Sequence, residues 1–172
     1  MKKILFTITI VLIYFSAIGQ DKILTHKGDS ILCTITEVGD KTIKYKHTGE
    51  ELVNTISKNI VSQLLFNNGR KQVISEKIVV ANEMDWEKVI ITKVESDVDG
   101  LTRVGEIMAK ANSGWSTTNQ GKMEKKAMEK LKKEAASQGC HIVLLLTTTG
   151  KGGHYGISGG TKASVTGIAY KY

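Results

Sequence analysis

Residues 123–146 read MEKKAMEKLKKEAASQGCHIVLLL and contain the clearest structural signal of the chain. Apolar residues recur there at every fourth position: Met123, Ala127, Leu131 and Ala135. This spacing places one apolar stripe on a helix. Gly139 follows as a stop signal, and residues 142–146 form a continuous apolar run that is typical of a buried strand. The stretch therefore predicts a helix followed by a core strand of the same unit.

The segments around this helix complete one unit, residues 86–172. Two runs rich in β-branched and apolar residues, 89–94 and 103–109, precede the helix, and residues 163–170 form a further run after it. Strand, strand, helix, strand, strand is the order of an α+β sandwich. We expect one helix on a mostly antiparallel sheet.

Residues 20–76 show a different pattern, because short β-branched runs alternate with turn residues. Six strands are expected, at residues 22–25, 30–38, 42–46, 52–57, 61–66 and 72–74. Many short strands in a segment of this size favour closure, since closure hides the strand edges. We predict a small all-β barrel, joined to the second unit by a connector at residues 77–85.

The first unit resembles the SH3-like or Sm-like β modules of exported bacterial proteins. The residues that carry this resemblance are turn and strand residues: Gly28-Asp29, Thr42-Ile43-Lys44-Tyr45 and Leu65-Phe66. They are generic for a small β module, so the resemblance transfers no functional residue.

The second unit resembles a small bacterial family of domains named for heavy-metal binding (YbjQ-like), and exported envelope stress sensors such as the Rcs lipoprotein. Its packing motifs carry the resemblance: Val104-Gly105-Glu106-Ile107, Ala127-x-x-x-Leu131-x-x-x-Ala135-Ala136 and Gly160-Thr161. Gly139-Cys140-His141 stands where that family typically has Gly-Ala-Asn. The resemblance transfers no metal-ligand set, and it implies assembly into a homo-oligomer.

The amino terminus has the pattern of a secretory signal. Lys2 and Lys3 precede an apolar run at residues 4–18, and small residues stand before Gln20 where a signal peptidase cleaves. We expect residues 1–19 to be removed and the mature protein to be periplasmic or secreted. No cysteine follows the cleavage site, so a lipid anchor is not expected.

The composition, with 41% apolar and 24% charged residues, is that of a folded globular protein. Without the two signal lysines, 22 basic and 17 acidic residues give the mature chain a net charge of +5. In an exported protein this excess favours an envelope protein or an anionic envelope surface as partner, and not nucleic acid. Simple solubility explains the same charge. Four lysines share one side of the expected helix, which is either a solvated face or an anion site: Lys122, Lys126, Lys130 and Lys133.

Residues 95–106 follow the spacing of a calcium-binding loop. The carboxylates at its first, third, fifth and twelfth positions are Glu95, Asp97, Asp99 and Glu106, and Gly100 is at the sixth. Three features oppose this hypothesis. The first position is Glu95 where the motif has Asp, Thr102 replaces an apolar residue, and the expected flanks are strands where the motif has helices. A solvated acidic turn between two strands is the alternative.

Cys140 is the second metal candidate, for a soft transition metal. Its neighbour His141 cannot ligate the same ion, because adjacent strand residues point to opposite faces. A site would need a further ligand from elsewhere in the chain: His154, His26, His47 or Cys33. The alternative is a buried thiol beside a partly exposed imidazole. Cys33 and Cys140 belong to different units, so no disulfide between them is expected.

No catalytic group is expected in this chain. Gly156-x-Ser158-x-Gly160 has the spacing of a nucleophile elbow, but a strand follows where that motif needs a helix. The glycine-rich loop instead displays His154 and Tyr155, which with Trp115 are candidates for contact with a macromolecular partner.

The sequence thus predicts an exported, non-enzymatic protein that acts as a binding, scaffold or sensor module without a cofactor. A metal-responsive module is the alternative hypothesis. One sheet face and one edge of residues 86–172 need a cover, so we also expect a homo-oligomer formed through this half.

Overall fold

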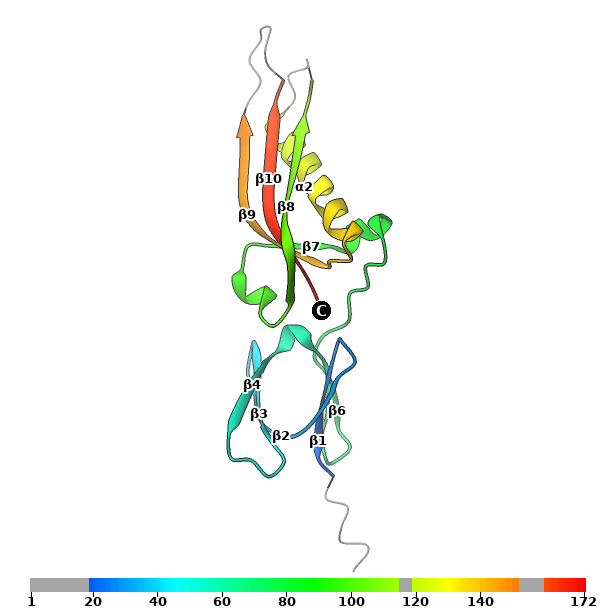
Figure 1. Cartoon of the computed structure of the whole chain (residues 1–172), viewed down its shortest axis with the longest axis vertical. Helices are drawn as coiled ribbons and strands as arrows, with labels where there is room; N and C mark the ends of the chain where they lie inside the picture. Colours follow the sequence, from blue (N-terminus) through cyan, green and yellow to red (C-terminus); the bar gives the residue numbers. More distant parts are fainter. Residues whose placement is uncertain (1–18, 115–118, 152–159) are drawn as a thin grey trace, which may run out of the picture. The chain divides into compact units, whose positions relative to one another are not determined.

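The computed structural model of the protein describes residues 19–114, 119–151 and 160–172. The chain folds as two compact units, Met1–Glu76 and Lys77–Tyr172, called here the amino-terminal and carboxy-terminal units. Each unit contains one sheet, and the one α-helix of the described residues belongs to the carboxy-terminal unit (Figure 1). The predicted α+β class is confirmed.

The sheet of the amino-terminal unit has six strands: β1 (Asp21–Thr25), β2 (Ser30–Val38), β3 (Thr42–His47), β4 (Val53–Ser57), β5 (Val61–Leu65) and β6 (Lys71–Val73). Their spatial order is β4-β3-β2-β1-β5-β6, and every neighbouring pair is antiparallel. The 3-10 helix η2 (Lys58–Ile60) joins β4 to β5. Strands β1 to β4 therefore form a meander, β5 pairs with the free side of β1, and β6 pairs with β5.

Alternation of apolar and polar residues builds this sheet. In β3, Ile43 and Tyr45 are buried while Lys44 between them is exposed, because successive side chains of a strand point to opposite faces. Buried residues of four strands form the core: Ile23, Cys33, Ile43, Tyr45, Val61 and Leu64. Gly28 closes the β1–β2 hairpin with a φ of 99°, a conformation that costs glycine little.

The amino-terminal sheet is open, which corrects the predicted closed barrel. Strands β4 and β6 are its two edges, and no ladder joins them in the part of the chain that the structure describes. Strand length gives the physical reason, since β6 has three residues and β4 five. Such short edges offer few backbone groups for a closing ladder. The sheet curves instead, and its concave face encloses the core (Figure 1).

The sheet of the carboxy-terminal unit has four strands: β7 (Ile90–Thr92), β8 (Thr102–Asn112), β9 (Ile142–Lys151) and β10 (Lys162–Lys171). Their order is β7-β9-β10-β8, with β7 parallel to β9 and the other pairs antiparallel. Two 3-10 helices, η3 (Glu83–Lys88) and η4 (Glu95–Val98), flank β7, and α2 (Gln120–Ser137) connects β8 to β9. Among the described residues, no helix is long and apolar enough to cross a membrane.

Helix α2 packs on one face of this sheet through small side chains. Ala127, Leu131 and Ala135 have no exposed surface and join one core with Ala109 of β8 and Val165 of β10. Small residues on both sides let the helix backbone approach the sheet closely. The apolar residues that recur at every fourth position therefore face the core, as their spacing predicts.

The end of α2 explains the stop signal at Gly139. This residue has a φ of 68°. Its N–H donates to the carbonyl of Ala136, and the N–H of Cys140 donates to that of Ala135, both at 2.9 Å. This pair of bonds is a Schellman motif, which satisfies the last carbonyls of a helix and favours glycine at the left-handed position.

The other face of the sheet is covered along only part of its length. Near β7, Val98 of η4 packs on Ile142 and Leu144. Farther along the sheet this face is exposed, and Met108 of β8 keeps 56% of its surface. The exposed part carries polar side chains at the positions that alternate with the buried ones.

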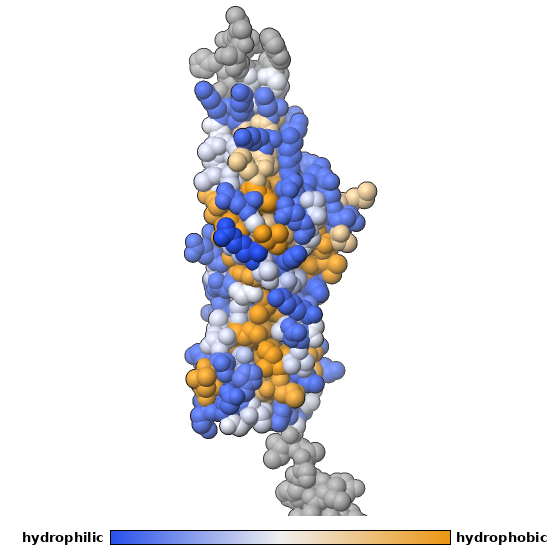
Figure 2. Space-filling model, in the orientation of Figure 1, coloured by the Kyte–Doolittle hydropathy of each residue, from blue (hydrophilic) through white to orange (hydrophobic). Residues whose placement is uncertain are grey.

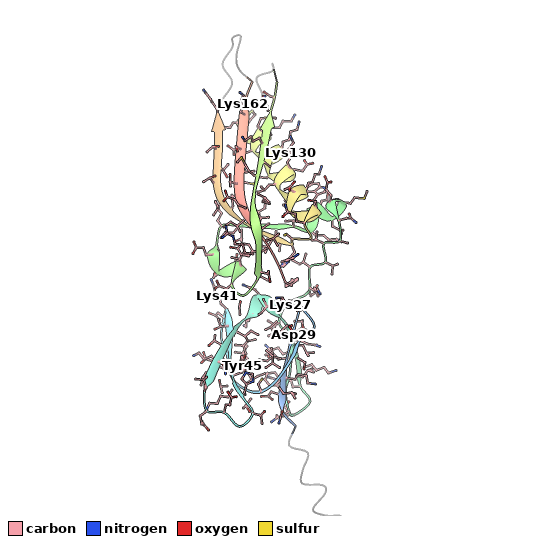
Figure 3. All side chains as sticks on the ribbon, in the orientation of Figure 1. Lys27, Asp29, Lys41, Tyr45, Lys130 and Lys162 are labelled. Carbon is pink, nitrogen blue, oxygen red and sulfur yellow. The ribbon has the colours of Figure 1, made fainter. Side chains whose placement is uncertain are left out.

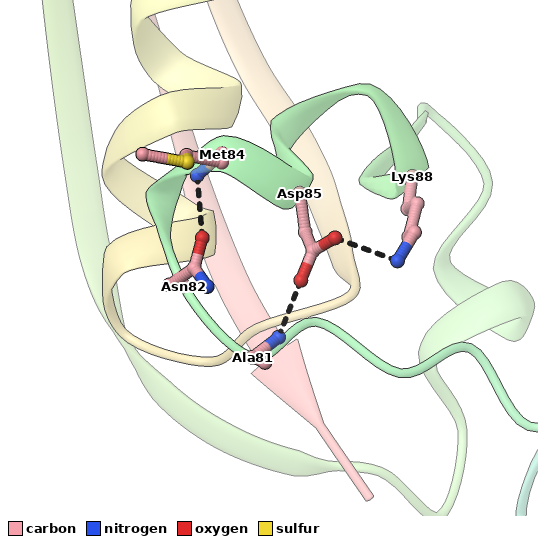
Figure 4. A network of polar contacts seen from close by, with 5 residues as sticks. All are labelled: Ala81, Asn82, Met84, Asp85 and Lys88. Carbon is pink, nitrogen blue, oxygen red and sulfur yellow. Dashed lines mark hydrogen bonds and ion pairs between the residues drawn. The ribbon is translucent and has the colours of Figure 1, made fainter.

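A polar network holds η3 at the start of the unit (Figure 4). The Asp85 carboxylate accepts hydrogen bonds from the N–H of Ala81 at 2.9 Å and from Nζ of Lys88 at 2.6 Å. The Asn82 side chain accepts from the N–H of Met84 at 2.9 Å. The hydrogen bond from Lys88 is the main cause that lowers the pKa of Asp85.

Candidate functional site

Charge is unevenly distributed along the carboxy-terminal unit. Residues 77–101 contain six acidic and three basic side chains, whereas residues 102–172 contain eleven basic and four acidic ones. The register places Lys162 at the start of β10 opposite both Asn112 and Lys151, the last residues of β8 and β9. Helix α2 also begins near this end, since Met123 and Asn112 line one hollow. Figure 2 shows hydrophilic residues gathered there, and we call it the basic end.

A hollow of about 440 Å³ lies at the basic end, and we call it the strand-end hollow. Its lining residues come from three strands: Lys110, Ala111, Asn112, Thr149, Gly150, Lys151, Lys162, Ala163 and Ser164. Each strand contributes one lysine, and Figure 3 shows Lys162 at this end. The lining also supplies hydroxyl and amide groups and contains no carboxylate.

Alternation in the strands explains why these polar groups share one face. In β10, Ala163 and Val165 are buried, whereas Lys162 is exposed and Ser164 is partly exposed. Since successive side chains alternate, the polar set lies on the face away from α2. The register then aligns Ser164 with Lys110 on one side and with Thr149 on the other.

A second hollow, of about 520 Å³, adjoins the first on the helix side. Its lining residues belong to α2 and the end of β8: Asn112, Ser113, Lys122, Met123, Lys125, Lys126 and Glu129. Glu129 accepts a hydrogen bond from Lys133 at 2.8 Å, which lowers the pKa of its carboxyl. One turn beyond Lys126, Lys130 donates from Nζ to the carbonyl of Lys110 at 3.1 Å. We call this second hollow the helix-side hollow.

The chemistry of both hollows suits anions. Ammonium, hydroxyl and amide groups all donate hydrogen bonds, and charge-assisted bonds to carboxylate, phosphate or sulfate are the stronger kind. One exposed ion pair contributes only about 0.2–1 kcal/mol. Useful affinity therefore needs several anionic groups on one partner, in the manner of a polymer.

The carboxylates of the hypothetical calcium loop lie on different elements. Glu95 and Asp97 belong to η4, Asp99 follows it, and Glu106 is in β8. The Asp97 carboxylate accepts a hydrogen bond from the hydroxyl of Thr92 at 2.6 Å. In the described ranges, no group of three or more His, Cys, Asp or Glu side chains is arranged to hold a metal ion.

The second metal candidate, Cys140, lies in the core under α2 and has no exposed surface. Burial raises the pKa of its thiol. Its neighbour His141 is also buried and stacks on Tyr172, with ring centroids 3.9 Å apart. Cys33 is in the core of the amino-terminal unit, and neither cysteine forms a disulfide. The structure thus places both thiols in packed surroundings.

One buried polar pair has no local sequence signal. Nε2 of His26 lies 2.7 Å from Oγ of Ser75, 49 residues away in the chain. The Ser75 hydroxyl donates to the carbonyl of Val61 at 2.9 Å, so the histidine ring donates to the serine oxygen. A serine whose proton is used in this way is not activated by a base. The pair holds the segment after β6 against β5.

Trp115, His154, Tyr155 and Ser158 lie outside the described residues. Among the residues that are described, the two lysine-lined hollows are therefore the candidate site, and only the separate lysines of α2 were singled out from the sequence.

In comparisons with known proteins, the chain matches no family model, no curated protein and no solved structure.

Proposed function

We propose that this is an exported, non-enzymatic binding protein of the cell envelope, and that its basic end holds an anionic partner. The strand-end hollow carries the proposal. Three strands each place one lysine there, beside hydroxyl and amide donors and without a carboxylate. Like charges gathered at one place repel each other, and an anionic ligand removes this repulsion.

Export is supported by the pattern of residues 1–19, and it determines the kind of partner. Outside the cytoplasm, polyanions are envelope polymers, anionic surfaces and acidic polypeptides. Sequencing the amino terminus of the mature protein tests this part. We expect Gln20 as the first residue, whereas a retained Met1 would contradict export.

The non-enzymatic part is supported by the state of the nucleophiles. Both thiols are buried, and burial raises the pKa of Cys33 and Cys140. Thiols in apolar surroundings are poor nucleophiles because the thiolate is disfavoured. The Ser75 hydroxyl donates to a backbone carbonyl.

Self-association of the carboxy-terminal unit is part of the proposal. Large apolar side chains are exposed on the short edge strand β7 and in the segments just before and after it in the chain: Val79, Met84, Ile90 and Val94. Met84 keeps 90% of its surface and Ile90 keeps 46%. Exposed apolar groups beside a sheet edge suit contact with a second copy. Light scattering of the mature protein should give a mass above that of one chain, and a single-chain mass would refute this part.

Binding of soluble polyglutamate tests the central claim. Replacing Lys110, Lys151 and Lys162 together by glutamate should weaken binding at least about tenfold, because each lost pair contributes about 0.5 kcal/mol. Anisotropy of labelled polyglutamate gives the dissociation constant. Binding should also weaken as salt increases, since exposed charges are screened.

The matched control changes the same charge elsewhere. Lys27, Lys41 and Lys71 are exposed in the amino-terminal unit, and their joint replacement by glutamate should change the affinity by less than about threefold. Equal weakening in both variants would show that net charge alone attracts the polymer, which would overturn the proposed site.

A further inference from the structure

Strand β8 presents a long free edge. It has eleven residues, and within residues 19–114, 119–151 and 160–172 its one strand partner is β10. The N–H of Ser113 donates to the carbonyl of Thr161 in the chain beside it, and the register is unshifted from Gly105 to Asn112. Backbone groups of an antiparallel strand alternate in direction. Even-numbered residues from 106 to 112 therefore direct their N–H and C=O away from β10.

A side chain of α2 provides independent evidence for this free edge. Nζ of Lys130 donates to the carbonyl of Lys110 at 3.1 Å. That carbonyl belongs to the even-numbered set and is reached from the helix side. A lysine of α2 thus lies against the β8 edge and satisfies one of its backbone groups in place of a strand.

The lysines of α2 beside this edge recur at every fourth residue, at Lys122, Lys126 and Lys130. Four helical residues rise by about 6 Å. Alternate side chains of an extended strand are about 6.7 Å apart. If a strand is paired with β8, carboxylates at every second residue of that strand therefore have nearly the same spacing as the three lysines of α2.

We infer that β8 accepts an extended acidic segment of a partner polypeptide as an added antiparallel strand. Alternate carboxylates of the segment face Lys122 and Lys126 in the helix-side hollow and Lys130 one turn farther along α2. The residues between them lie on the opposite face, where an apolar one covers the exposed side chain of Met108. The inference rests on the proposed function and deepens it by naming the class of partner.

A second copy of this chain fits the same edge poorly. Two β8 strands paired antiparallel in one continuous sheet would place their helices on the same side of that sheet. The lysines of both copies would then face one interface, and like charges across an interface are unfavourable. An acidic segment supplies the same backbone hydrogen bonds with opposite charge.

Two peptides with alternating glutamate and valine, each about eight residues long, test the added strand. In the proposed antiparallel pairing the valines direct their N–H to β8, and the glutamates direct theirs outward. N-methylation of every valine therefore removes the ladder, whereas N-methylation of every glutamate leaves it intact. The two peptides have identical charge and the same number of methyl groups.

We expect the full mature protein to bind the N-methyl-valine peptide at least about tenfold more weakly, a difference of about 1.4 kcal/mol. Replacing Lys122, Lys126 and Lys130 together by glutamate should weaken the N-methyl-glutamate peptide at least about tenfold. The matched control reverses the charge of three lysines that lie elsewhere in this unit, at positions 93, 132 and 171, and should change its affinity by less than about threefold.

The outcomes separate the two proposals. If polyglutamate binds but both peptides bind equally, the added strand is refuted while the anionic partner stands. Tighter binding of the N-methyl-valine peptide, or equal loss in both lysine variants, also refutes the added strand. If polyglutamate does not bind, the proposed function fails and this inference fails with it.

Discussion

Replacing Leu131 by alanine measures how tightly α2 and its sheet share one core. Leu131 has no exposed surface, and its neighbours on the same helix stripe are Ala127 and Ala135. Substitutions of this kind cost roughly 2.7–5 kcal/mol, and most where the surroundings cannot fill the cavity. The methyl groups of Ala127 and Ala135 are too short to fill the cavity that the substitution leaves. We therefore expect a loss of about 4 kcal/mol.

Urea unfolding followed by tryptophan fluorescence reports on this unit alone, because both tryptophans lie within residues 77–172. Trp86 packs directly against the core. With a slope of roughly 2 kcal/mol per molar urea, the midpoint should fall by about 2 M. Leu146→Ala makes the same change at a site that is 48% exposed, and should cost about 1 kcal/mol or less. A loss at Leu131 no larger than at this control would refute the shared core.

Three further predictions concern single residues. Gly139→Ala should destabilise the carboxy-terminal unit by roughly 1–2 kcal/mol in the same urea experiment, because its φ of 68° is unfavourable for alanine. Burial, and to a smaller extent the charge of Asp21, raises the pKa of Cys33 from 9.0 to about 11. The stability that this thiol contributes should therefore be complete below pH 9 and be lost towards pH 11. Thermal melts should show this loss in the unchanged protein and not in Cys33→Ala. The pKa of Asp85 is lowered from 3.8, so the stability that its carboxylate contributes is present above pH 3.8 and lost as the pH falls below it. In that acidic range the urea midpoint of Asp85→Asn should depend less on pH than the midpoint of the unchanged protein.

Local patterns were sufficient for most elements of this protein. The period of four residues in α2 and the alternation in β3 each report which side chains face a core, and both repeats span only a few residues. Gly139 likewise marks the end of a helix because the left-handed conformation is a property of a single residue. Such features depend on neighbours in the chain, which a sequence displays directly.

Strand pairing was less predictable, as two differences show. Strand β9 was expected at residues 142–146 but continues to Lys151, because β10 supplies hydrogen bonds to a segment with no apolar alternation. The barrel was expected to close, but β4 and β6 are too short. Both outcomes depend on partners that are distant in the chain, and no local pattern encodes them.

The candidate site shows the same division. The sequence by itself determined the α+β class, the positive charge and the lysines of α2. Only the tertiary structure brought Lys110, Lys151 and Lys162 to one hollow and placed β8 at a sheet edge beside the helix. The physical reason is that strand register and sheet order are set by hydrogen bonds and packing between distant segments, and these decide which charges become neighbours.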